Sequence, residues 1–161
     1  MNHAIAVDAS VAVKWVVIEP LSAQARALVA DSAAARRRLL APPHFAGEVT
    51  NALHQRWRSG DPTKRLTDAE TDAAIATFLQ FRVEPRNPAG LYERALRLAR
   101  DWHLASVYDA LYVVLAEIEG VELWTADSRL IRELGDQAPW VKPLSSYPLP
   151  GELGVVPEAP N

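Results

Sequence analysis

The sequence contains no cysteine among its 161 residues. This absence excludes disulfide bonds, thiolate zinc sites and cysteine nucleophiles, and it fits a cytosolic protein. Long hydrophobic runs are also missing, because the longest apolar stretch, Val11–Ile18, contains Lys14 and is too short to span a bilayer. The N-terminus has no basic leader and no small-residue cleavage site, so it does not read as a signal peptide. We therefore expect a cytoplasmic protein that does not enter a membrane.

Several common catalytic motifs are absent as well. The sequence has no P-loop, no Gly-x-Gly-x-x-Gly fingerprint and no His-Glu-x-x-His segment. The four histidines lack zinc-ligand spacing, and we expect packing or solvent-exposed roles for His3, His44, His54 and His103. The alternative for His44 is an approach to Glu48, which lies one helical turn further along the chain. A formal net charge of −3 argues against a protein that coats nucleic acid by bulk attraction, although an acidic pocket can offset basic patches elsewhere.

What is present is the pattern of an ordinary globular domain, with 49% hydrophobic and 23% charged residues. A chain of this length can bury a core as a single domain without disulfides. The continuous apolar run Ala4–Val7 is typical of a parallel strand that is buried on both faces. The patterns predict strands at 4–7, 39–41, near 83, 121–125 and 140–143, and helices at about 10–17, 22–35, 44–58, 67–81, 88–102, 106–119 and 128–134.

Because strands alternate with helices, we predict an α/β fold with a central, mainly parallel sheet of four to five short strands. The domain would occupy residues 1–147. Residues 148–161 form a Pro/Gly-rich C-terminal tail, with four of the twelve prolines and two of the seven glycines, and we expect this tail to be loose. Parallel sheets bind ligands beyond the carboxyl ends of their strands, where the strand order switches, so the functional residues should lie there.

Four acidic residues fall at such places: Asp8, Glu48, Asp109 and Asp127. Helix capping alone would explain Asp8 and Asp127, and the segment from Ser106 to Asp109 resembles a capping box. Glu48 lies in the second turn of its helix and cannot cap it, although it could be an ordinary surface carboxylate. Together, four carboxylates at one sheet edge would raise one another's pKa values unless a cation is present. Mg²⁺ prefers such hard oxygen ligands, and we expect that Mn²⁺ can substitute.

A cation held by carboxylates predicts phosphodiester hydrolysis. The cation would polarise a phosphoryl oxygen and hold the leaving oxygen. A metal-activated water would attack phosphorus in line with the 3′-oxygen, which is the leaving group. This reaction gives 3′-hydroxyl and 5′-phosphate ends and needs no serine or cysteine nucleophile. Glu48 would orient or deprotonate the water, and Asp127 would hold the cation or a second one.

Four segments of the sequence resemble the motifs of PIN-domain proteins of the VapC toxin type. They are Val7–Trp15, Pro42–Leu53, Ser106–Glu117 and Leu123–Leu130, they occur in the family order, and the resemblance extends from about residue 3 to residue 147. It implies a PIN-like three-layer α/β/α fold and an endoribonuclease that depends on Mg²⁺ or Mn²⁺.

The resemblance also implies roles for particular residues. Asp8 and Asp109 would be the principal metal ligands, and Glu48 and Asp127 would complete the acidic cluster, directly or through water. Ser10 and Thr125 match the family's small hydroxyl positions and would orient the carboxylates by hydrogen bonds; their alternative is a cap or turn role.

The partners implied are RNA, a second copy in a homodimer, and a VapB-type antitoxin whose tail blocks the acidic pocket. One alternative is a non-catalytic PIN-like module that binds RNA or protein without cutting, and another is a nuclease that acts on branched DNA. A phosphatase of the haloacid-dehalogenase kind fits poorly, because it needs a second aspartate two residues after Asp8, where this chain has Ser10. Dependence on a divalent cation separates the nuclease from the binding module.

Overall fold

Five parallel strands form the centre of the computed structural model, which describes residues 3–149. They are β1 (Ala4–Val7), β2 (Arg38–Ala41), β3 (Val83–Pro85), β4 (Leu123–Thr125) and β5 (Val141–Pro143), in the order β3-β2-β1-β4-β5. Each neighbouring pair is parallel, with Ala6 opposite Leu40 on one side and Leu123 on the other. The predicted α/β class and parallel sheet are confirmed, and the strand predicted near residue 140 lies at the edge.

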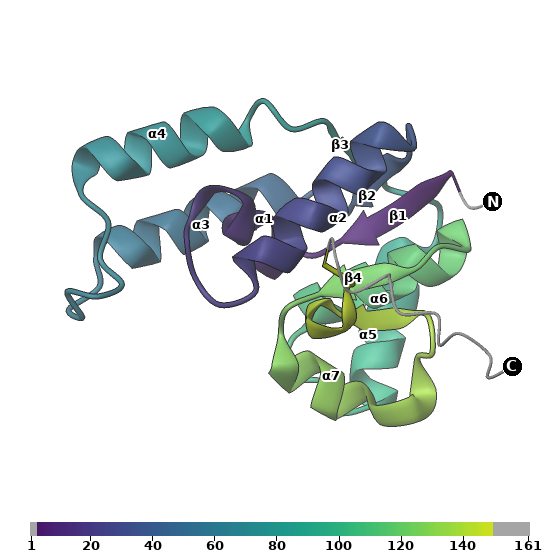
Figure 1. Ribbon diagram of the computed structural model, residues 1–161. Coiled ribbons are helices and arrows are strands. Elements are labelled where there is room, and N and C mark those ends of the chain that lie inside the picture. The colour runs from purple at the N-terminus through teal and green to yellow at the C-terminus, as the bar shows by residue number, and fades with distance from the viewer. Residues whose placement is uncertain (1–2, 150–161) are drawn as a thin grey trace, which may run out of the picture.

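Helices cover both faces of this sheet. They are α1 (Ala9–Val16), α2 (Ser22–Ala34), α3 (Phe45–Trp57), α4 (Asp68–Phe78), α5 (Leu91–Asp101), α6 (Val107–Glu119) and α7 (Ser128–Leu134), followed by short 3₁₀ turns at Gly135–Gln137 and Leu144–Ser146. Figure 1 shows α1 to α4 on one side of the sheet and α5 to α7 on the other. Right-handed crossovers explain this division, because the chain winds outward from β1 to β3 and then returns past β1 to β4.

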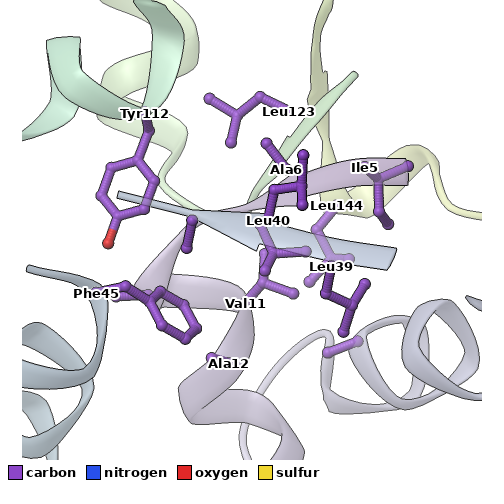
Figure 2. Close-up of a cluster of buried hydrophobic side chains, with 14 of the residues drawn as sticks. Ile5, Ala6, Val11, Ala12, Leu39, Leu40, Phe45, Tyr112, Leu123 and Leu144 are labelled. Carbon is purple, nitrogen blue, oxygen red and sulfur yellow. The ribbon is translucent and has the colours of Figure 1, made fainter. Parts of the chain in front are cut away.

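The main core lies between these layers. The strand β1 is buried along its whole length, as its continuous apolar sequence predicts. Figure 2 shows part of the surrounding cluster, including Leu40, Leu123 and Tyr112. A smaller cluster joins α5 to α6 through Leu91 and Leu115. In the part of the chain that the structure describes, no helix is long and apolar enough to cross a bilayer.

Several helix boundaries differ from the predicted ones. The helix expected from residue 88 begins at Leu91, because Gly90 has a φ of +78° and this left-handed conformation cannot belong to a right-handed helix. The helix expected to reach residue 81 ends at Phe78. Its predicted start is confirmed, since Thr67 and Glu70 form a capping box. The helix expected from residue 44 begins at Phe45, and His44 is its N-cap.

The switch in strand order falls between β1 and β4, which lie side by side at the centre of the sheet. Winding reverses between these two strands, so the loops that follow them diverge and leave a place for functional side chains. Asp8 directly follows β1, and Asp127 follows β4 by two residues. The division between residues 1–147 and 148–161 stays a prediction, and most of the expected tail lies outside the described residues.

Candidate active site

Asp8 joins the end of β1 to the start of α1. It is the N-cap of α1, and its Oδ1 accepts a hydrogen bond from the backbone N–H of Ser10 at 2.6 Å. Its Oδ2 accepts a short hydrogen bond from the Thr125 hydroxyl. Asp8 is only 7% exposed, and this burial raises its pKa to about 6 against the opposing effect of both hydrogen bonds. The carboxylate thus caps a helix and also lies buried where the strand order switches.

Ser10 and Thr125 connect the loops that follow β1 and β4. The Ser10 Oγ accepts a hydrogen bond from the backbone N–H of Ala126 at 2.9 Å, and the two hydroxyl oxygens lie 3.5 Å apart. The Thr125 Oγ1 also accepts from the backbone N–H of Asp127 at 3.0 Å. These contacts fix Asp8 relative to the Asp127 loop, which is what the predicted orienting role requires.

Asp127 and Asp109 come from different helices. Asp127 is the N-cap of α7, and its Oδ1 accepts from the backbone N–H groups of Arg129 at 2.8 Å and Leu130 at 3.1 Å. Asp109 lies in the first turn of α6, but it makes no capping box, because Ser106 caps that helix through the backbone N–H of Tyr108. Burial raises the pKa of Asp109 despite a nearby guanidinium, and the charges of Asp127 and Glu48 add to the rise.

Arg129 bridges these two aspartates. Its Nη2 lies 2.8 Å from Asp109 Oδ2 and 3.0 Å from Asp127 Oδ2, and its Nη1 contacts Glu133 at 3.2 Å. The hydrogen bond to Asp109 and the surrounding carboxylates raise the pKa of Arg129, so the guanidinium stays charged. A positive side chain therefore already neutralises one side of the acidic cluster.

Glu48 forms the other side of the cluster. Its Oε2 accepts a hydrogen bond from the Tyr112 hydroxyl at 2.5 Å, and His44 Nε2 lies 3.4 Å from the same atom without the alignment of a good hydrogen bond. Burial raises the pKa of Glu48, but the interactions with His44 and Tyr112 outweigh it and lower that pKa below its ordinary value. Burial and the charges of Asp8 and Glu48 raise the pKa of Tyr112, so this hydroxyl remains a donor.

The four predicted residues are brought into one neighbourhood. Glu48 acts electrostatically on both Asp8 and Asp109, and Asp127 acts on Asp109. In kind, this set of carboxylate oxygens fits Mg²⁺ or Mn²⁺. Within residues 3–149, however, no three acidic, histidine or cysteine side chains are arranged to hold one ion. Donors of the chain engage each of the four carboxylates, and Arg129 contacts both Asp109 and Asp127.

Sequence reasoning missed two residues of this site, Tyr112 and Arg129, and it favoured a packing role for His44 over an approach to the site. The signal for Tyr112 was its position three residues after Asp109, which places both side chains on one face of α6. Packing was expected for His44, and its ring does pack against Tyr108 and Tyr112 at centroid distances of 5.2 and 5.1 Å. Arg129 gave no comparable signal, because an arginine in the first turn of a helix is usually solvated.

A separate groove of about 1010 Å³ lies near the other end of α1. It is lined by the loop after α1, including Ile18 and Glu19, and by Arg56 and residues of α4. None of the four acidic residues lines this groove. The groove is therefore distinct from the candidate active site.

Comparison with known proteins places the chain in a family. Residues 5–135 match the PIN domain. Ribonuclease VapC3 of Mycobacterium tuberculosis is 39% identical over 98 residues, which are 61% of this chain and 66% of that relative. Ribonuclease VapC12 of the same organism is 33% identical over 135 residues, which are 83% of this chain and 95% of that relative. The crystal structure of PAE2754 from Pyrobaculum aerophilum has a TM-score of 0.59 and 25% identity, covering 88% of this chain and 83% of that one.

The chain belongs to the PIN-domain family, and the relatives that it resembles in sequence are of the VapC type. This confirms the resemblance recognised in the four sequence motifs. The likeness to a solved structure also agrees with the α/β fold and its single parallel sheet.

Proposed function

We propose that this chain is a metal-dependent endoribonuclease of the VapC type, acting in the cytoplasm as the toxin of a toxin–antitoxin pair. Its substrate is RNA, its cofactor Mg²⁺ or Mn²⁺, and its partners a cognate antitoxin and a second copy of the chain. The ribonuclease names of the VapC3 and VapC12 relatives support the substrate and the antitoxin.

One observation carries the proposal. Asp8 is a buried carboxylate at the strand switch whose hydrogen-bond donors, Ser10 N–H and the Thr125 hydroxyl, are both neutral. A buried negative charge without a positive partner is costly, and a bound cation removes that cost. Asp8 together with the nearby Glu48, Asp109 and Asp127 therefore supports a cation-binding role better than a purely structural one.

Each acidic residue would have its own role in the hydrolysis. Asp8 and Asp109 would hold the cation, which supplies charge to stabilise a phosphoryl oxygen and lowers the pKa of a water. The pKa of Glu48 is lowered, and Tyr112 holds this carboxylate by a hydrogen bond, so Glu48 would orient or deprotonate the attacking water. Asp127 completes the negative cluster from the N-terminus of α7.

A second candidate is a PIN-like module that binds RNA or protein without cutting. One observation favours it: in the described part of the chain, Arg129 rather than an open set of three carboxylates occupies the middle of the cluster. The sequence still retains all four acids, which a binding module would be free to lose.

Incubation of the purified chain with structured RNAs separates the candidates. We expect cleavage in Mg²⁺ or Mn²⁺, none in EDTA, and products with 5′-phosphate ends. Asp109→Asn keeps the size of the side chain and removes its charge, and it should abolish cleavage while the circular dichroism spectrum stays that of the parental protein. Cleavage by Asp109→Asn at the parental rate, or RNA binding that is indifferent to EDTA without cleavage, would overturn the proposal.

A further inference from the structure

Arg129 lies at the centre of a small charged cluster, and it uses its two terminal nitrogens differently. The Nη2 atom donates to Asp109 Oδ2 at 2.8 Å and to Asp127 Oδ2 at 3.0 Å. The Nη1 atom donates to both oxygens of Glu133, at 3.2 and 3.3 Å. One end of the guanidinium therefore holds the candidate metal ligands, and the other holds a carboxylate one helical turn further along α7.

Both oxygens of Asp127 already accept hydrogen bonds. Its Oδ1 already accepts the backbone N–H groups of Arg129 and Leu130 as the cap of α7. Only Oδ2 is left to face a cation, and Arg129 occupies that atom. A cation that binds Asp109 and Asp127 together must therefore displace Nη2 or share its oxygens.

The contacts on the other side give the displaced guanidinium somewhere to stay. Glu133 is 24% exposed along its side chain, and its Oε2 is further fixed by the backbone N–H of Ala105 at 3.4 Å. The Arg129 side chain is 42% exposed, so it can rotate without disturbing the core. Glu133 thus holds the guanidinium through a contact that does not involve the two aspartates.

We propose that Arg129 is an exchangeable counter-cation, which closes the acidic cluster between Asp109 and Asp127 in the metal-free protein and moves onto Glu133 when a divalent cation binds. The inference rests on the proposed function and adds a positioning residue to it. Arg129 stabilises the metal-free fold by separating two like charges, and it lowers metal affinity by competition. Glu133 raises metal affinity, because it draws the guanidinium away.

The two roles predict shifts of opposite sign in Mn²⁺ affinity. Calorimetric titration of the EDTA-stripped full-length protein gives the dissociation constant without any RNA. In Arg129→Gln we expect binding roughly three- to tenfold tighter, which corresponds to the loss of two partly exposed ion pairs, and a lower Tm without metal. In Glu133→Gln we expect binding about two- to threefold weaker, because Arg129 then rests on the aspartates alone.

Arg132→Gln is the matched control. Arg132 lies on the same helix and carries the same charge, but it contacts the Ser128 hydroxyl at the long distance of 3.5 Å. Its Mn²⁺ affinity should equal that of the parental protein, and an equal gain in Arg132→Gln and Arg129→Gln would reduce the effect to net charge and overturn the inference.

The outcomes also separate the inference from the proposed function. Parental protein that binds Mn²⁺ through Asp109, with unchanged or weaker binding in Arg129→Gln, overturns the counter-cation role and leaves the nuclease proposal intact. Parental protein that binds no Mn²⁺ overturns both. Should Arg129→Gln fail to fold, Glu133→Gln decides alone, since unchanged or tighter binding in that variant contradicts the competition.

Discussion

The helix α1 has a nearly buried carboxylate near each end, and the two are balanced in different ways. Asp8 precedes the helix and Glu19 follows it by three residues. Glu19 is 11% exposed along its side chain and forms ion pairs with Lys14, at 2.5 Å, and with Arg56. Asp8 is similarly buried, but its hydrogen-bond donors are neutral.

The difference separates a structural acid, Glu19, from the acid that we propose to be functional, Asp8. Lys14 comes from α1 and Arg56 from α3, so the pairing of Glu19 ties two helices together with charges that the chain itself supplies. Among residues 3–149 no ion pair balances Asp8, and the charge of the neighbouring Glu48 further raises the pKa of Asp8. Burial alone does not mark a carboxylate as a candidate functional residue, and burial without a positive partner is the feature on which we base the proposal for Asp8.

The largest effect that we expect is the loss of RNA cleavage on replacing Asp8. Asp8→Asn removes the unbalanced charge, and asparagine is still a good N-cap for α1. We expect RNA cleavage to fall by at least about 100-fold, because replacing even an indirect partner of a metal ligand costs that order of activity. Glu19→Gln should keep its activity within about twofold. Cleavage rates of the two variants at saturating Mn²⁺ test this, and equal losses in both would remove the distinction between the two acids.

The pH dependence of stability provides the second test. The pKa of Asp8 is about 6 in the folded protein against 3.8 for an unperturbed aspartate, so the native state binds this proton more tightly than the unfolded state. The folded state therefore loses stability as pH rises from about 4 to about 6, by up to ~3 kcal/mol. Asp8→Asn lacks this loss. Urea denaturation of both metal-free proteins at several pH values measures this loss, because the other titrating groups contribute equally to both and cancel in the difference. Parallel plots of unfolding free energy against pH would show that burial does not raise the pKa of Asp8.

Glu19 should give the complementary result. Glu19→Gln leaves Lys14, which is 13% exposed, without its negative partner, and Arg56 loses the same partner. We expect a loss of about 1–2 kcal/mol in the free energy of unfolding, between the values for surface and fully buried pairs. Denaturation at neutral pH measures it, with Arg38→Gln as control, since Arg38 pairs with Glu84 across an exposed contact of 3.1 Å. A loss no larger than that of the control would make the Glu19 pairs ordinary surface ones.

Much of the fold was predictable because its signals are local. The apolar run of β1 and the capping box before α4 follow from neighbouring residues. The strand order and the division of helices between the two faces depend on tertiary packing, and no local pattern encodes them. The start of α5 was predicted too early, because Gly90 adopts a left-handed conformation that glycine tolerates and that the apolar pattern does not reveal.

The sequence predicted four acids that the structure brings into one neighbourhood, but it did not predict all of their partners. Ser106 and Asp109 have the spacing of a capping box, yet Asp109 contacts Arg129 on another helix instead. That choice depends on how α6 and α7 pack, which a motif cannot show. The assignment of Asp8, Glu48, Asp109 and Asp127 as metal ligands stays a prediction, because Arg129 lies where an open cation site was expected.

The smallest expected effect concerns how Glu48 is held. Tyr112→Phe removes the hydroxyl that donates to Glu48 at 2.5 Å and leaves the ring in the core. We expect a loss of about 1 kcal/mol in stability, as for one hydrogen bond, and a several-fold fall in cleavage rate because Glu48 can then rotate. Tyr92→Phe is the control, since Tyr92 is exposed on α5. A stability loss with an unchanged cleavage rate would make Tyr112 a packing residue, and the orientation of Glu48 would then depend on His44 alone.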